Sequence, residues 1–246
     1  MQKKSDYRDI TDIHCHIIYG VDDGAQDRET AAEMLRIAHS EGIRNIILTP
    51  HYKVHHHADI NTVNEKALKL KKIIEDEGLD IRLFLGSEIQ YFADAPSYIE
   101  DGHIARMCGS RYVLAEFMPK DDIRHIKAGL YDLQSSGYLP ILAHIERYEC
   151  MLGNIDHARD LKNSGIYIQV NAGSIDGVFG AATKKYSRNL IKEDLVDFIA
   201  SDAHNTQKRA PRFKKTIKYL ERKKGSDYVE RIFIENPSNI ISDEII

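Results

Sequence analysis

The sequence Asp12-Ile13-His14-Cys15-His16, followed by Asp22-Asp23-Gly24, decides how the chain can be interpreted. Residues 9–16 are typical of a β-strand, along which side chains alternate between two faces, so His14 and His16 leave the same face at its end. Two imidazoles on one face can bind a single metal ion, and an aspartate in the following turn adds a hard oxygen ligand. The stretch therefore predicts a metal site at the end of the first strand, with a pair of ordinary surface histidines as the alternative.

Strand-like apolar segments alternate with amphipathic helical segments along the chain. The expected strands are 9–16, 45–49, 81–85, 112–115, 139–143, 167–170 and 196–200. The expected helices are 27–42, 60–77, 122–136, 156–163, 180–193, 210–223 and 227–235, with a short one near 96–100. Such alternation is typical of parallel strands with helices outside them, and seven strands come close to the eight of a TIM barrel. The pattern predicts a distorted or incomplete (β/α) barrel. An open doubly wound sheet is the alternative, but its usual glycine-rich nucleotide-binding fingerprints are absent from the sequence.

Length and composition favour one large domain. The chain has 246 residues, which suits a single α/β barrel, so we expect residues 1–8 to form a polar N-terminal arm and residues 9–246 a single domain. A formal net charge of -4 argues against nucleic acid held by bulk charge. No apolar run approaches the roughly 18 residues of a membrane span, the N-terminus lacks the apolar region of a signal peptide, and three cysteines make no disulfide framework. These features predict a cytoplasmic protein without a membrane span or a nucleic-acid partner.

Residue types that bind metals follow six of the seven expected strands. They are His14, His16, His51, Glu88, Glu116, His144, Asp202 and His204. In (β/α) barrels the active site lies at the carboxyl ends of the strands, where these side chains would converge. So many ligands exceed the need of one tetrahedral ion and suit two or three ions with a bridging carboxylate. Because the set offers nitrogen and oxygen without thiolate, it favours manganese, iron, zinc or magnesium.

Two arginines follow candidate ligands closely. Arg147 comes three residues after His144, and Arg209 comes five after His204. A guanidinium group pairs with phosphate oxygens through two parallel hydrogen bonds, so both arginines are predicted to clamp a phosphate. Sites with several metal ions typically act on phosphate esters, and a bound metal lowers the pKa of water from 15.7 to about 7. Hydrolysis by such a hydroxide needs no nucleophilic side chain and forms no phosphoenzyme.

Six short motifs, in this order, resemble those of the PHP (polymerase and histidinol phosphatase) superfamily. They are D-I-H-C-H at 12–16, V-D-D-G at 21–24, T-P-H-Y at 49–52, G-S-E at 86–88, A-H-I-E-R at 143–147 and S-D-A-H at 201–204. Within the superfamily, the chain most resembles the bacterial manganese-dependent protein tyrosine phosphatases of capsule and exopolysaccharide loci, over about residues 9–239. Tyr19 and Ile145 stand where these proteins usually have proline, which affects the shape of two loops and replaces no ligand.

The resemblance implies a distorted (β/α)7 TIM-like barrel, the PHP fold, in which residues 9–246 form one metallophosphatase domain with its active site at the carboxyl ends of the strands. It also implies three divalent metal ions, manganese foremost. By similarity the ligands form three sets: His14, His16, Glu88 and Asp202; Glu88, Glu116 and His144, with Glu88 bridging; and Asp23, His51 and His204. Arg147 and Arg209 match the phosphate-binding arginines. His51 or Asp23 would act as the general acid. The implied substrate is a phosphotyrosine protein, an autophosphorylating bacterial tyrosine kinase that controls polysaccharide export.

Two other functions stay open on the sequence, and a third fails. A histidinol-phosphate phosphatase of the same superfamily would use the same metals in a deeper pocket, and a non-catalytic metal-binding regulatory module would share the fold. A cysteine phosphatase needs arginine six residues after its cysteine, where this chain has Val21, Leu114 and Asp156. The three histidines at 55–57 are either a solvated loop or a mobile flap, and the basic stretch 214–224 is expected to be a solvated helix face.

Overall fold

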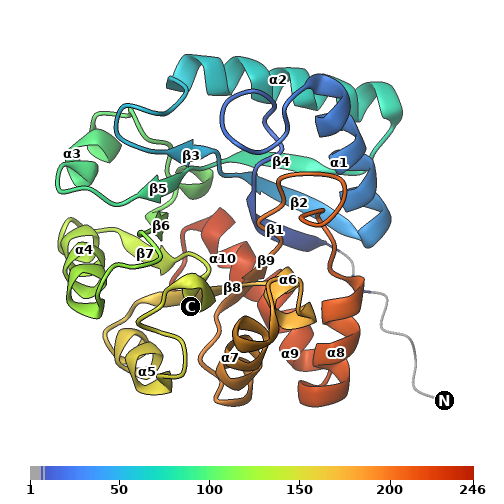
Figure 1. Cartoon of the computed structure of the whole chain (residues 1–246). Helices are drawn as coiled ribbons and strands as arrows, with labels where there is room; N and C mark the ends of the chain where they lie inside the picture. Colours follow the sequence, from blue (N-terminus) through green and yellow to red (C-terminus); the bar gives the residue numbers. More distant parts are fainter. Residues whose placement is uncertain (1–6, 8) are drawn as a thin grey trace.

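The computed structural model describes Tyr7 and residues 9–246, and the rest of the expected N-terminal arm lies outside the described residues. Strands and helices alternate through most of the chain (Figure 1). The strands are β1 (Ile10–Cys15), β2 (Ile43–Leu48), β3 (His51–Tyr52), β4 (Arg82–Leu85), β5 (Glu88–Gln90), β6 (Tyr112–Glu116), β7 (Leu139–Leu142), β8 (Tyr167–Asn171) and β9 (Phe198–Ala200). The helices are α1 (Arg28–Glu41), α2 (Ile60–Glu77), α3 (Ala95–Glu100), α4 (Ile123–Ser135), α5 (Ile155–Asn163), α6 (Ala172–Asp176), α7 (Ala181–Lys192), α8 (Lys214–Lys224), α9 (Ser226–Glu230) and α10 (Asn236–Ser242).

All paired strands run parallel, as the alternation predicts. One sheet has the order β1-β2-β4, and the other has the order β3-β5-β6-β7-β8-β9. The strands expected at 45–49 and 81–85 are each extended by a short strand that was not predicted, β3 and β5, after a two-residue interruption at 49–50 and 86–87. Pro50 contributes to the first break in these two divided strands because it has no N–H for the ladder. The N–H of Gly86 donates to the carbonyl of Leu48 at 2.8 Å, and that of Glu88 donates to the carbonyl of Pro50 at 3.1 Å. The two divided strands thus stay side by side through the breaks.

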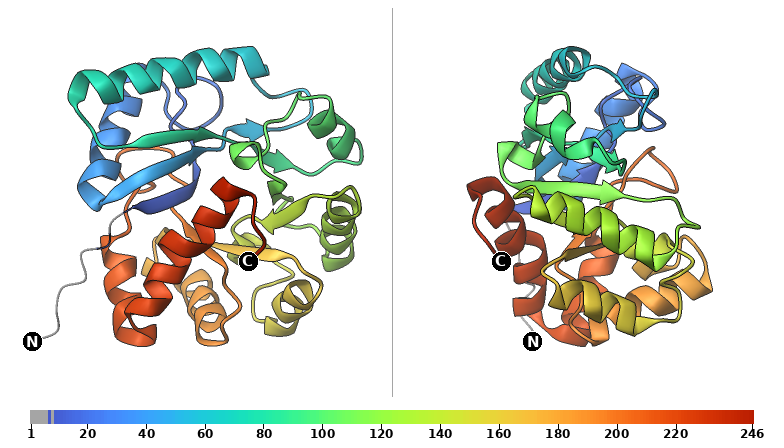
Figure 2. Two further views of the ribbon diagram at one scale, coloured as in Figure 1. Left: turned by 180° about the vertical axis from the view of Figure 1, so that it is seen from behind. Right: turned by 90° about the vertical axis from the view of Figure 1, so that its left-hand side faces the viewer.

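The first and last strands approach each other at a single point. β1 and the end of β9 are joined by one isolated parallel bridge, between Cys15 and Ala203. The N–H of Asp202 donates to the carbonyl of His14, and that of His16 donates to Ala203, both at 2.9 Å. The parallel strands thus curl around a common interior with helices on the outside (Figures 1 and 2). The α/β class and the curled parallel sheet are confirmed, whereas a complete seven-stranded barrel stays a prediction.

Apolar side chains fill the interior of the curled sheet. Ile13, Ile47, Leu114 and Phe198 belong to this inner cluster and are completely buried, as is Ile240 from α10. Figure 2 shows α10 lying across the side of the sheet opposite to the one that faces the viewer in Figure 1. A second and larger cluster packs between the strands and the surrounding helices. The interior is therefore a packed core, which leaves the carboxyl ends of the strands as the place for polar chemistry.

Local signals in the sequence explain where several helices begin and end. The carboxylates of Asp27, Asp59 and Asp122 accept hydrogen bonds from backbone N–H groups in the first turns of α1, α2 and α4. Gly42 and Gly78 end α1 and α2 in the left-handed conformation, with φ of 94° and 63°. The helices that cover the first half of the sheet are thus fixed at both ends by short-range interactions.

The C-terminal third departs from the sequence prediction in detail. α8 begins at Lys214 instead of 210, because residues that precede a proline, here Pro211, disfavour the helical conformation. The helix expected at 227–235 continues through a π-helical segment, Arg231–Glu235, into α10. The short helix α6, directly after β8, was not predicted. No helix formed by the described residues combines the length and the hydropathy of a membrane span.

Candidate metal centre

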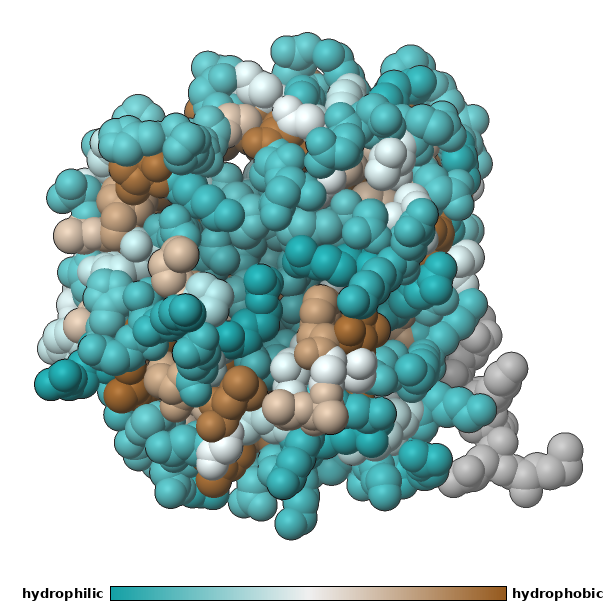
Figure 3. All heavy atoms as spheres, viewed as in Figure 1, coloured by the Kyte–Doolittle hydropathy of each residue, from teal (hydrophilic) through white to brown (hydrophobic). Residues whose placement is uncertain are grey.

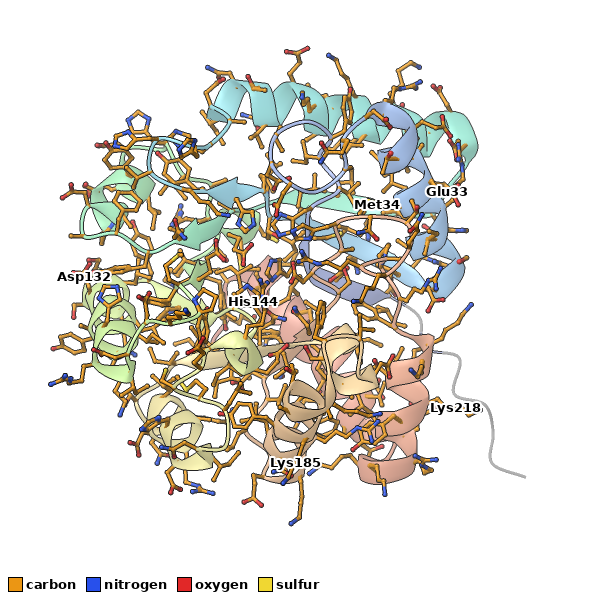
Figure 4. The ribbon with its side chains drawn as sticks, viewed as in Figure 1. Glu33, Met34, Asp132, His144, Lys185 and Lys218 are labelled. Carbon is orange, nitrogen blue, oxygen red and sulfur yellow. The ribbon has the colours of Figure 1, made fainter. Side chains whose placement is uncertain are left out.

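The ligands predicted from the sequence meet at the carboxyl ends of the strands. In Figure 4, His144 points into a group of nitrogen- and oxygen-bearing side chains near the centre of the view. All of these residues are buried except Asp23, which is exposed, and His51, which is partly buried. The group contains His14, His16, Asp23, His51, Glu88, Glu116, His144, Asp202 and His204. The prediction that these residues converge is confirmed, while their roles as ligands stay predictions.

His14, His16 and Glu88 form the first of three groups that could hold a metal ion. The Nε2 atoms of the two histidines face each other at 3.1 Å, and each lies 3.1 Å from Oε2 of Glu88. Burial lowers the pKa of His16, but the carboxylates of Asp22 and Glu88 outweigh it and raise that pKa to about 9. Burial also opposes ionisation of Glu88, yet the neighbouring histidines hold its pKa well below the ordinary range. The site therefore stabilises positive charge at one point between three side chains.

His51, Glu88 and Glu116 form the second group. Nδ1 of His51 lies 3.0 Å from Oε2 of Glu88 and 3.0 Å from Oε1 of Glu116. These three buried atoms nevertheless have no hydrogen-bond partner in the described structure. Buried polar atoms normally have hydrogen-bond partners, so a cluster of unpartnered nitrogen and oxygen atoms that can act as metal ligands fits a bound cation. His144 was predicted here, and its Nε2 lies 2.7 Å from Oε1 of Glu88 and 3.8 Å from Oε2 of Glu116.

His16, Asp23, His51 and His204 form the third group. Oδ1 of Asp23 lies 3.3 Å from Nε2 of His51 and 3.5 Å from Nε2 of His204. Nε2 of His204 is buried and has no hydrogen-bond partner among the described residues. Its Nδ1 lies 3.0 Å from the carbonyl oxygen of Asp202, which leaves Nε2 available to a cation. The predicted set Asp23, His51 and His204 is brought together, with His16 as an additional neighbour.

The two adjacent aspartates of the quoted stretch behave differently. Asp23 is exposed at the rim, whereas the side chain of Asp22 is only 5% exposed. Oδ2 of Asp22 lies 2.7 Å from Nδ1 of His16 and accepts the backbone N–H of His51 at 3.0 Å. A partner on Nδ1 fixes the orientation of the imidazole and directs Nε2 inward. Gly24 is required here, because a Cβ atom at this position would lie 2.2 Å from the carbonyl oxygen of His16.

A buried chain of amide side chains connects three candidate ligands, and no motif in the sequence predicts it. Oε1 of Gln169 accepts the backbone N–H of His144 at 2.8 Å and lies 3.2 Å from Nδ1 of His14. Nε2 of Gln169 donates to Asn171 at 2.8 Å, and Nδ2 of Asn171 donates to Oδ2 of Asp202 at 2.8 Å. Because a backbone N–H can only donate, the orientation of Gln169 is fixed. Nδ1 of His14 must then carry the proton, which leaves its Nε2 free to bind a metal.

Asp12 and Cys15 take structural positions beside the cluster. The carboxylate of Asp12 accepts hydrogen bonds from both the N–H and the hydroxyl of Ser201, which ties β1 to the segment after β9. Cys15 packs in the outer apolar cluster, on the other side of β1 from the histidines, as predicted for a small core residue. Its thiol is completely buried and cannot reach a substrate.

Both predicted phosphate-binding arginines reach the cluster at Asp202. Nη2 of Arg209 donates to Oδ1 of Asp202 at 2.8 Å, and Nη1 of Arg147 donates to Oδ2 at 3.4 Å. Nε of Arg209 is a buried donor without a partner among the described residues. The side chain of Arg147 is 40% exposed, and the residue lines a cavity of about 220 Å³ together with Lys53, Glu116, Met118 and His144. Unused guanidinium donors beside a cation site can accommodate a tetrahedral anion.

The remaining sequence predictions fall on the loops. The three histidines at 55–57 are exposed, and the ring of His57 stacks on Tyr52 with 4.0 Å between the ring centroids. Ile145 is buried in a short 3-10 turn, and Tyr19 packs partly buried with Lys66 Nζ 5.1 Å from its ring. Neither departure from proline displaces a candidate ligand.

Comparison with known protein families identifies the chain. The family model described as capsular polysaccharide synthesis, CpsB/CapC, matches residues 10–242. The chain belongs to this family. It is 33% identical over 243 residues to the tyrosine-protein phosphatase CpsB of Streptococcus pneumoniae, covering 96% of this chain and 100% of the relative. It is also 33% identical over 239 residues to the tyrosine-protein phosphatase YwqE of Bacillus subtilis, covering 96% of this chain and 93% of the relative.

Solved structures support the same assignment. One solved structure comes from a description of YwqE from B. subtilis and CpsB from S. pneumoniae as metal-dependent tyrosine phosphatases. It superposes with a TM-score of 0.89 at 32% identity, and the match covers 96% of both chains. The histidinol phosphate phosphatase of Lactococcus lactis matches with a TM-score of 0.54 at 14% identity, over 96% of this chain and 94% of that one. The second match shows a shared fold alone. The resemblance to bacterial metal-dependent tyrosine phosphatases, predicted from the motifs, is confirmed.

Proposed function

We propose that this protein is a metal-dependent protein tyrosine phosphatase, which hydrolyses phosphotyrosine on an autophosphorylating bacterial tyrosine kinase that regulates capsular or exopolysaccharide synthesis. The observation that carries the proposal is the cluster of buried histidines and carboxylates, with several unpaired donor atoms, beside two partly exposed arginines. Membership of the CpsB/CapC family and the names of the relatives agree with it. We assign the protein to the cytoplasm, where such a kinase would expose its phosphotyrosines.

The proposed ligands overlap with the three groups of side chains at the strand ends, with Asp202 added to the first group and His144 in place of His51 in the second. They are His14, His16, Glu88 and Asp202 for one ion, Glu88, Glu116 and His144 for a second, and Asp23, His51 and His204 for a third. Manganese is our first choice, and iron, zinc and magnesium suit the same donors. When bound, such ions act as Lewis acids and lower the pKa of coordinated water. Glu88 contacts members of all three groups, so it is the proposed bridge.

Arg147 and Arg209 are the proposed phosphate-binding residues. Both already have one donor directed at Asp202, and their other N–H groups can take phosphate oxygens. Cys15, the cysteine next to the site, is completely buried, and the carboxylates and histidines are the proposed metal ligands, so we infer direct hydrolysis without a phosphoenzyme. The leaving tyrosine has a pKa near 10 as a free phenol, which makes protonation of the leaving oxygen a modest requirement. His51 and Asp23, in contact at the rim, are the candidates for that proton transfer.

We also infer that the two sheets together form one distorted (β/α)7 barrel and that residues 9–246 act as one domain. The hydrogen bonds across residues 48–50 and 86–88 support continuity of the divided strands, and the bridge between Cys15 and Ala203 supports closure. Hydrogen exchange of the backbone amides at these positions would test whether the strands are continuous and the barrel is closed. Protection of the Gly86 and Ala203 neighbourhoods equal to that of β6 would agree with a closed barrel.

The decisive experiment compares two substrates after metal removal. The purified protein is stripped with a chelator, reconstituted with manganese, and assayed for phosphate release from a phosphotyrosine peptide and from histidinol phosphate. We expect a much higher kcat/KM for the peptide, no activity in chelator, and loss of activity in His144→Ala. A preference for histidinol phosphate would replace the proposed substrate while retaining the metals. Metal binding without release from either substrate would favour a non-catalytic metal-binding module.

A further inference from the structure

A second cavity lies on the Arg209 side of the candidate metal centre. Its volume is about 430 Å³, and it lies between the segment after β9, the start of α8, and the turn that joins α6 to α7. Arg209 and Ser201 line its inner part, and Lys208, Arg212, Val178 and Phe179 line its outer part. In Figure 3, hydrophilic side chains and a small hydrophobic patch border the hollow at the centre of this face. Arg209 relates the cavity to the proposed phosphate-binding site, because it lines the cavity and its Nη2 donates to Asp202 at 2.8 Å.

Two of the cations that line this cavity, Lys208 and Arg212, have no acidic partner among the described residues. Lys208 and Arg212 are exposed, and neither forms an ion pair with any described residue. Nζ of Lys215 lies 3.9 Å from Oδ1 of Asp176, a long and exposed contact. A chain with a net charge of -4 therefore concentrates unpaired positive charge on one wall beside its site.

The two carboxylates that line the cavity are already engaged. Oε2 of Glu41 accepts the backbone N–H of Phe213 at 3.0 Å and that of Lys214 at 2.8 Å. Asp176 is the partner of Lys215, and burial raises its pKa. Neither acid is directed at Lys208 or Arg212, so both cations remain available to a ligand with negative charge.

The opposite wall is apolar and exposed. Phe179 is 39% exposed, and it stands in the turn between Gly177 and Gly180, both with positive φ. Val178 precedes it and also lines the cavity. A wall with one exposed aromatic ring facing two free cations suits a peptide segment that combines negative and apolar side chains. Free phosphate or a small metabolite would leave the apolar wall unused.

We propose that this cavity binds the residues next to the phosphotyrosine of a protein substrate, and that it selects acidic ones. The inference rests on the proposed function, because the phosphotyrosine itself would occupy the neighbouring site at Arg147 and Arg209. Lys208 and Arg212 bind the acidic side chains, and Phe179 packs against the peptide. Substrate specificity then resides in the 207–212 segment, which also carries the phosphate-binding Arg209.

The test uses three phosphotyrosine peptides that differ only in their flanking residues, which are glutamate, serine or lysine, together with p-nitrophenyl phosphate as a probe without flanks. The wild-type protein should prefer the glutamate peptide, and the preference should shrink as salt rises. In the double variant Lys208→Ala/Arg212→Ala, KM for the glutamate peptide should rise about two- to tenfold, in line with the strength of exposed ion pairs. Hydrolysis of p-nitrophenyl phosphate should stay unchanged.

A matched control removes two other exposed lysines. Lys185→Ala/Lys218→Ala makes the same change in net charge, and Figure 4 shows both side chains away from the centre of the face. It should leave all kinetic constants as in the wild type. Arg212→Glu should shift the preference toward the lysine peptide. Equal kcat/KM for the three peptides, or equal effects of the two double variants, would overturn the docking proposal while the phosphatase assignment stands. Failure to hydrolyse even p-nitrophenyl phosphate would overturn the proposed function itself.

Discussion

Substitution of Gln169 by leucine tests whether the buried amide chain positions the metal ligands. Leucine has nearly the same size but cannot hydrogen-bond, so the change would leave the N–H of His144, Nδ1 of His14 and Oδ1 of Asn171 without partners. All of these groups are buried. A buried polar group that loses its partner costs about 1–3 kcal/mol. For three such groups we therefore expect the metal-free protein to lose about 3–9 kcal/mol of its free energy of unfolding.

The same substitution should weaken metal binding. Without Gln169, nothing fixes the tautomer or the ring orientation of His14, and loss of such an outer partner typically lowers metal affinity about 10- to 100-fold. Manganese affinity is measured by calorimetry on stripped protein, and stability is measured by urea unfolding in chelator. Gln169→Glu keeps an acceptor for His14 and His144, so it should retain more manganese affinity than Gln169→Leu. It serves as the second variant if Gln169→Leu is too unstable to assay.

Gln134→Leu is the control for a glutamine-to-leucine change. Gln134 is partly buried in the last turns of α4 and donates one hydrogen bond, at 3.0 Å, to the carbonyl of Ser164. Surface changes of this kind alter stability by about 0.5 kcal/mol or less and should leave metal affinity unchanged. The positioning role of Gln169 would be refuted if Gln169→Leu bound manganese as tightly as the wild type and were no less stable than Gln134→Leu.

Three further outcomes follow from the site. Metal affinity should rise with pH between about 6 and 8, because the metal must displace the proton on His16, whose pKa is about 9 in the metal-free protein. Calorimetry at these two pH values should show a gain in affinity of up to about tenfold per pH unit. Gly24→Ala should cost about 1–3 kcal/mol and weaken metal binding, because its Cβ would lie 2.2 Å from the carbonyl of His16; thermal unfolding measures the loss, and an unchanged Tm would show that the turn is free to move. Alkylation with iodoacetamide at neutral pH should leave kcat unchanged, because Cys15 is buried, and burial raises the pKa of Cys108 to about 12 and also raises that of Cys150. Inactivation by the reagent would instead support a thiol mechanism.

Much of the site could be predicted because each candidate ligand carries a local signal. A continuous apolar run ends, and a histidine or a carboxylate follows, as at His51, Glu88 and His144. In a parallel sheet this pattern has a direct spatial meaning, because the carboxyl ends of all strands lie on one side. Parallel pairing alone was therefore enough to bring residues from distant segments together, before any contact between them was known.

The parts that could not be predicted depend on contacts between distant segments. Gln169 and Asn171 lie within an ordinary strand pattern, and their partner His14 is 155 residues from Gln169. Nothing in the neighbouring sequence distinguishes a buried amide that orients a histidine from one that faces solvent. The short strands β3 and β5 were missed for a related reason, because each has only two or three residues and is defined by its pairing with a neighbouring strand.

Asp22 and Asp23 show where sequence reasoning about a ligand reaches its limit. The two residues are identical and adjacent, and either could serve as a hard ligand at the turn. Burial separates them, because Asp22 is enclosed and satisfied by His16, Gly24 and His51, whereas Asp23 stays at the rim facing His51 and His204. An enclosed carboxylate with its oxygens committed to protein donors can orient a histidine but has little capacity left for a cation. The exposed one retains that capacity, and it is also the one that a substrate entering from solvent would meet first.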